Sequence, residues 1–121
     1  MKLFTVFISG VLLLLIDLIY LNATKSITQK HIRMIQGSTS TINIYGAILC
    51  YIFLIFGLNY FIIDQNKSVL DAFLFGIVVY GVYETTNWAI FKLWPPFLVI
   101  MDTLWGGILF ASTTYIIKKI I

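Results

Sequence analysis

Four long apolar stretches alternate with short polar ones along the chain. They cover about residues 3–21, 44–63, 69–91 and 97–117. A helix needs about 20 mostly apolar residues to cross the roughly 30 Å hydrocarbon core of a bilayer, and each stretch has about that length. Because lipid offers the backbone no hydrogen bonds, such stretches form helices, which satisfy their own N–H and C=O groups. The pattern predicts an all-α integral membrane protein, in which residues 1–121 form a single domain, a bundle of four transmembrane helices.

The two later connections between these stretches are short. DQNKS (residues 64–68) separates the second from the third, and KLWPP (residues 92–96) separates the third from the fourth. Proline is tolerated in the first turn of a helix but not in its interior, so the two prolines end one helix and can begin the next. We expect these helices to be antiparallel neighbours. An even number of spans places both termini on one side of the membrane, here called face A; the opposite side is face B.

The first connection, residues 22–43, is longer and more polar. Ile27, Ile32 and Ile35 are spaced along one face of a helix that would end at Gly37. A short amphipathic helix lying in the membrane interface fits this pattern. An irregular polar loop fits it equally well.

Composition agrees with a membrane location. The chain is 60% hydrophobic and 11% charged, against roughly 25% charged residues in average soluble domains. A soluble chain of 121 residues could not bury so much apolar surface in one core, so its first expected partner is the lipid bilayer. The net charge of +3 comes from scattered Lys and Arg near the span ends, which does not favour nucleic-acid binding. These residues divide equally between the two faces, so the positive-inside rule predicts no orientation.

Three of the five acidic residues fall inside the predicted spans. Asp64 lies in a turn, and Asp71 lies at the start of the third span, where an acid suits the helix dipole. Asp17 and Asp102 lie about five residues from the face-B ends of their spans, and Glu84 about seven. At 1.5 Å per residue these depths are roughly 7, 7 and 10 Å. Three helices are therefore predicted to place a carboxylate at similar depth in the same half of the membrane.

Helical spacing places an aromatic or amide side chain about one turn from each of these acids. Polar groups exposed to lipid are costly, so we expect the faces that carry them to turn inward and form one pocket. Three ionised carboxylates close together would repel one another. We therefore expect at least one of them to be protonated, or a cation or a basic side chain from face B to compensate them. The candidate pocket residues are Asp17, Tyr20, Tyr80, Tyr83, Glu84, Asn87, Asp102 and Trp105.

The order of these residues resembles a known family of small predicted membrane proteins, domain of unknown function 2177. The resemblance rests on Asp17 in the first span, on YETTN (residues 83–87), on WP (residues 94–95) and on DTLWG (residues 102–106). Glu84 stands where the family pattern would have Asp, which keeps the charge and moves it by one methylene. Family members occur in bacteria and in large DNA viruses. The resemblance implies a cellular or viral membrane protein with the same topology and the same acids, and it implies no activity.

Three functions are compatible with such a pocket. It could serve binding, packing or assembly, by holding the helices together or by binding a lipid head group or a small ligand. It could belong to a proton or cation channel or transporter that uses Asp17, Glu84 and Asp102, since intramembrane acids often mark ion paths. A membrane-embedded enzyme is the least favoured, because no span contains His and no nucleophile–base motif occurs. The sequence specifies neither a cofactor nor a metal.

The half of the bundle toward face A is predicted to be poorer in polar groups. It has no acid near the midplane, which does not favour a complete path for ions. The single cysteine, Cys50, lies in an apolar stretch and is predicted to be a small buried hydrophobe. Because four helices enclose little volume, we also expect copies of the chain to form a homo-oligomer.

Overall fold

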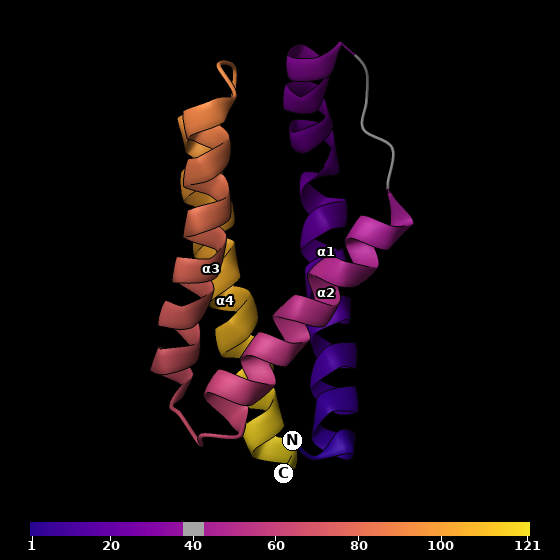
Figure 1. Ribbon diagram of the computed structural model, residues 1–121, viewed down its shortest axis with the longest axis vertical. Coiled ribbons are helices and arrows are strands. Elements are labelled where there is room, and N and C mark those ends of the chain that lie inside the picture. The colour runs from indigo at the N-terminus through magenta and orange to yellow at the C-terminus, as the bar shows by residue number, and fades with distance from the viewer. Residues whose placement is uncertain (38–42) are drawn as a thin grey trace.

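The computed structural model describes residues 1–37 and 43–121, and the described part consists of helices joined by short turns. Residues 38–42, which belong to the predicted first connection, lie outside the described residues. Figure 1 shows the helices running along the long axis of the molecule, with both termini at the same end. The four-helix architecture with both termini on one side is thus confirmed. The elements are α1 (Leu3–Gln36), α2 (Ile44–Leu58), the π-helix η1 (Asn59–Ile63), α3 (Val69–Ile90) and α4 (Pro96–Ile120).

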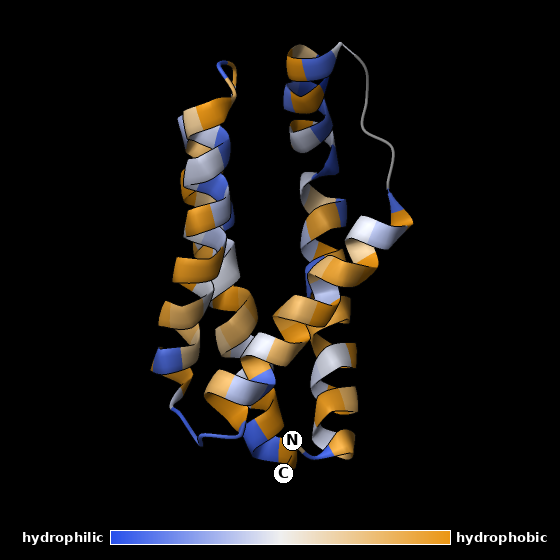
Figure 2. Ribbon diagram, viewed as in Figure 1, coloured by the Kyte–Doolittle hydropathy of each residue, from blue (hydrophilic) through white to orange (hydrophobic). Residues whose placement is uncertain are grey.

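Several helix ends coincide with capping residues or prolines in the sequence. Within the described residues, four helical segments are long and apolar enough to cross a membrane, with α2 and η1 counting as one of them. Apolar residues predominate along them (Figure 2). At the start of α3, the Ser68 side chain accepts from the backbone N–H of Asp71, and the Asp71 carboxylate accepts from that of Ser68. This reciprocal cap satisfies two backbone donors that a helix leaves free. Pro96 occupies the first turn of α4, as predicted.

The segment after the first span is helical and ends at Gly37, as the first alternative predicts, so the irregular loop is wrong; the helix is not a separate one, however, but continues α1. Residues 22–36 are helical and end at Gly37, which adopts the left-handed conformation with φ 80°. Residues 22–36 contain no Gly or Pro, and Thr24 donates its hydroxyl to the Tyr20 carbonyl instead of capping a new helix. The 34 residues of α1 span about 51 Å, roughly 20 Å more than the hydrocarbon core. Its last turns therefore extend beyond that core.

Helices α3 and α4 form the closest pair in the described structure, because glycines line their contact. A Cβ atom added to Gly76 would lie 2.1 Å from the Gly106 carbonyl oxygen and 2.9 Å from the Gly107 Cα. Only glycine permits this approach of two backbones, and small residues at helix contacts are the usual route to tight packing in lipid. The carboxylates of Glu84 on α3 and Asp102 on α4 are thereby brought to neighbouring surfaces.

Helix α2 runs obliquely across α1, and it begins about halfway along α1 (Figure 1). The face-B half of the bundle is consequently flanked by α1, α3 and α4, while α2 covers only the lower part. The hydrophobic core lies in the face-A half, one or two turns from the acids along α1 and α4. Its buried members are Leu13, Leu54, Leu58, Ile62, Ala72, Leu109 and Phe110.

A buried polar contact between two helical segments lies in this apolar half. The Asn59 side-chain amide, which is fully buried, donates to the Ser9 hydroxyl at 2.9 Å and to the Ile55 carbonyl at 2.8 Å. Asn59 is the first residue of η1, and its backbone N–H also bonds the Ile55 carbonyl. The side chain therefore adds a second bond to that carbonyl, and its contact with Ser9 joins η1 to α1.

Candidate functional site

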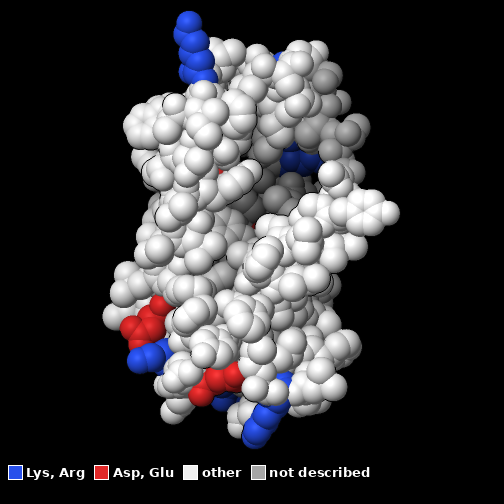
Figure 3. All heavy atoms as spheres, in the orientation of Figure 1, with Lys and Arg blue, Asp and Glu red and all other residues white. Residues whose placement is uncertain are grey.

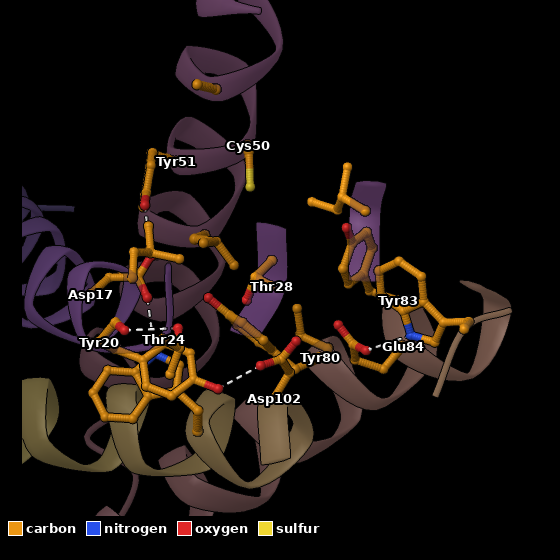
Figure 4. Close-up of a pocket in the computed structure, with 17 residues that line it drawn as sticks. Asp17, Tyr20, Thr24, Thr28, Cys50, Tyr51, Tyr80, Tyr83, Glu84 and Asp102 are labelled. Carbon is orange, nitrogen blue, oxygen red and sulfur yellow. Dashed lines mark hydrogen bonds between the residues drawn. The ribbon is translucent and has the colours of Figure 1, made fainter. Parts of the chain in front are cut away.

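A cavity of about 490 Å³ lies in the face-B half of the bundle, between all four long helices and the turn that carries Trp94. This volume falls within the range of roughly 300–1,000 Å³ that is typical of small-molecule sites. Seven of the eight predicted pocket residues line it (Figure 4), and they come from α1, α3 and α4. They are Asp17, Tyr20, Tyr80, Tyr83, Glu84, Asp102 and Trp105.

Asp17 is held by two aromatic donors from two other helices. Its carboxylate is 5% exposed. One oxygen accepts from the Tyr51 hydroxyl of α2 at 2.6 Å, and the other accepts from the Trp105 indole N–H of α4 at 2.9 Å. The side chain is therefore fixed in position, and it links α1, α2 and α4.

Asp102 is held by Tyr20 across the contact between α1 and α4. The Tyr20 hydroxyl of α1 donates to the Asp102 carboxylate of α4. The Tyr20 ring also stacks on the Trp105 ring, with centroids 4.3 Å apart and planes 4° from parallel. Because Trp105 itself bonds Asp17, one stacked aromatic pair orients two of the three acids.

Glu84 lies nearest the α3–α4 turn and is 1% exposed. Its carboxylate accepts from the Trp94 indole N–H at 3.0 Å. The backbone N–H of Trp94 bonds the Phe91 carbonyl, and this tight turn folds the indole back over the end of α3. Glu84 and Asp102 both point into the cavity (Figure 4).

The remaining polar residues of YETTN do not line the cavity. The Thr85 and Thr86 hydroxyls donate at 2.6 Å to the carbonyls of Gly81 and Val82, in the preceding turn of α3. This back-bonding satisfies them within their own helix. Asn87, which was predicted to flank Glu84 in the pocket, is half-buried outside it. The hydrogen bond to Glu84 comes from Trp94 instead of Asn87.

Ten of the 17 lining residues were not among the predicted pocket residues, and Tyr51, Trp94 and Cys50 are three of these. Tyr51 and Trp94 donate to two of the acids, yet Tyr51 lies deep in an apolar stretch and Trp94 stands out in the sequence only through the WP motif. Cys50 also lines the cavity, and its side chain is exposed. The prediction that Cys50 is a buried hydrophobe is thus wrong, because the oblique course of α2 turns this residue toward the cavity.

The cavity combines acidic and aromatic groups without a basic partner. None of the described residues that line it is Lys, Arg or His. His31, which could have reached in from face B, packs its ring against Phe97 at 5.2 Å between centroids. Within residues 1–37 and 43–121, no cluster of three His, Cys, Asp or Glu side chains is arranged to hold a metal ion. None of the described lining side chains could therefore compensate the carboxylates, while Lys or Arg atoms are visible within the hollow in Figure 3.

Comparisons with known proteins agree with the membrane assignment and with the resemblance found in the sequence. No curated protein and no solved structure matches the chain. A family model described as a predicted membrane protein (DUF2177) matches residues 2–117. Because this match covers nearly the whole chain, the protein belongs to the DUF2177 family of predicted multi-pass membrane proteins.

Proposed function

We propose that this protein is a membrane-embedded binding protein whose cavity holds a positively charged group. The observation that carries the proposal is the convergence of three carboxylates from three helices on one cavity without a basic lining residue. Intramembrane acids normally face a partner, because an unpaired charge in lipid costs several kcal/mol. A cationic group is the complementary partner that this cavity lacks.

The hollow between the acids supports binding over simple packing. Hydrogen bonds between membrane helices contribute only about 0.6 kcal/mol on average, so three buried acids are a costly way to join helices. A carboxylate has about four acceptor positions, and Trp94 occupies one of those on Glu84. The aromatic donors thus orient the acids and leave acceptor positions available to a ligand.

The apolar core supports binding over conduction through a single chain. A proton or cation that crossed from the cavity to face A would meet Leu13, Leu58 and Phe110, each fully buried. Conduction by Asp17, Glu84 and Asp102 is the second candidate function, and it would need a path between copies of the chain. The predicted homo-oligomer stays a prediction, and the mass of the protein–detergent complex would test it.

The single cysteine provides a direct assay, because Cys50 lines the cavity. A maleimide should alkylate Cys50 in reconstituted protein, and tetramethylammonium or an alkylammonium amphiphile should slow the reaction in a saturable way. Glu84→Gln combined with Asp102→Asn should abolish this protection. The matched control is Asp64→Asn, since Asp64 pairs with the N-terminal amine outside the cavity. If neither cation protects Cys50 in folded protein, the binding proposal is wrong.

Liposome flux measurements separate the second candidate from the first. Proton or cation flux that disappears in the Glu84→Gln, Asp102→Asn variant, with helicity retained, would favour conduction. Protection of Cys50 without flux would favour binding.

A further inference from the structure

The cavity opens on the side of the bundle, at the level of the membrane-spanning parts of the helices, where the protein faces lipid. Figure 3 shows a hollow on this side, above the oblique α2 and between α1 and the α3–α4 pair. Helix α3 packs along α4 and makes few contacts with α1 or α2. Along α1 the lining runs from Asp17 to Ile32, a rise of about 22 Å. The opening therefore extends from the interior of the membrane toward the face-B interface.

Away from the acids the lining is mainly apolar, with Thr24 and Thr28 of α1 as polar members. Leu21 and Ile32 of α1, Leu54 of α2 and Val79 of α3 contribute aliphatic surface to the same cavity as the carboxylates. A small water-soluble cation would leave this surface without a partner. A molecule with both a polar head and an apolar chain would cover both kinds of lining, because burial of apolar area is favourable in proportion to the area covered.

The polar part of the cavity has the composition of an ammonium site. Its acids are Asp17, Glu84 and Asp102, and its aromatic rings come from all four helices and the α3–α4 turn. Electron-rich rings attract alkylammonium groups through cation–π interactions, and aromatic cages are a recurring way to bind them. Carboxylates nearby balance the charge. The aromatic lining residues are Tyr20, Tyr51, Tyr80, Tyr83, Trp94 and Trp105.

We propose that the ligand is a membrane amphiphile with an alkylammonium head group, which enters sideways from the face-B leaflet between α1 and α3. Its head lies among the carboxylates and aromatic rings, and its chain lies along the aliphatic lining. This inference rests on the proposed binding function and adds the ligand class and the entry route.

The test compares probes that share either the head group or the chain. Protein in nanodiscs is exposed to dodecyltrimethylammonium at low mole fraction, to tetramethylammonium in the buffer, or to dodecyl sulfate, and the rate of Cys50 alkylation is measured. We expect the cationic amphiphile to slow alkylation at least tenfold more than tetramethylammonium does, while dodecyl sulfate changes the rate less than twofold.

Each other outcome overturns a defined part of the proposal. Equal protection by tetramethylammonium and the cationic amphiphile would refute the claim that an apolar chain contributes to binding. The proposed binding function would remain. Equal protection by dodecyl sulfate would refute the selection of a cationic head. No protection by either cation would refute the inference together with the proposed function.

A pair of variants tests the entry route separately. Ala47 of α2 lines the cavity, and its neighbour Ile48 is 51% exposed and does not line it. Ala47→Phe should narrow the opening and slow the onset of protection by the amphiphile at least fivefold, whereas Ile48→Phe should not. Helicity by circular dichroism confirms that both variants fold. Equal onset in the two variants would refute entry through the opening above α2, between α1 and α3.

Discussion

The glycine contact between α3 and α4 leads to the sharpest prediction, because a single methyl group should force the two helices apart. In Gly76→Ala the new Cβ would lie 2.1 Å from the Gly106 carbonyl oxygen. A close carbon–oxygen contact measures about 3.3 Å, so the backbones must separate by roughly 1.2 Å. The Gly106 carbonyl oxygen and the Gly107 Cα belong to the backbone of α4, so neither atom can rotate away from the new Cβ.

Gly81→Ala is the matched control on the same helix. A Cβ at Gly81 would meet only the Thr103 methyl group, at 3.5 Å, which is ordinary contact. Both variants gain helix propensity of up to about 1 kcal/mol, since each replaces a helical glycine by alanine. Because the gain is the same in both variants, the difference between their free energies of unfolding measures the cost of the collision at Gly76. Overpacking costs about 1–3 kcal/mol or more, and contact with backbone favours the upper end.

The assay is unfolding of purified protein by increasing dodecyl sulfate in mild-detergent micelles, followed by far-ultraviolet circular dichroism. We expect Gly76→Ala to be less stable than Gly81→Ala by at least about 2 kcal/mol in free energy of unfolding. Equal stability of the two variants would refute the close approach of α3 and α4. It would also remove the reason for placing Glu84 beside Asp102.

Three further substitutions test single contacts in the same unfolding assay. Tyr51→Phe deletes the hydroxyl that donates to Asp17 and should cost about 0.6–1.7 kcal/mol, the range of interhelical bonds in membranes; an unchanged midpoint would contradict this contact. Ser9→Ala removes the hydroxyl that accepts from the buried Asn59 amide and should cost a similar amount, and a stabilised variant would contradict the contact. Ser68→Ala removes the cap of α3 and should cost about 1 kcal/mol. The double variant with Asp71→Ala should lose less stability than the sum of the two single variants. Strict additivity would refute the reciprocal cap.

The helices and their ends were predictable because the signals are local. Apolar length marks the spans, Pro96 marks the start of α4, and Gly37 marks the end of α1. Each of these depends on the conformational preference of one residue or on the composition of about twenty. The continuity of α1 past residue 21 was missed because polarity suggested a boundary where no helix-breaking residue stands.

The candidate pocket was predictable in part for a related reason. Helical periodicity fixes which residues of one helix share a face, and the cost of polar groups in lipid turns that face inward. This was enough to bring Asp17, Glu84 and Asp102 into one cavity, whose use for binding stays a proposal. Periodicity does not fix how one helix is tilted or rotated against the next, and so it could not place Tyr51 or Cys50.

The sequence alone thus determined the membrane location, the number of spans and the acidic faces, because these follow from hydrophobicity and from helical geometry within each segment. The tertiary structure decided the partners of the acids. Tyr51 reaches Asp17 across 34 positions of the chain, and Trp105 reaches it across 88. Such contacts depend on the tilt of α2 and on the glycine-dependent approach of α3 and α4. Those are properties of packed surfaces, and no single segment of the sequence specifies them.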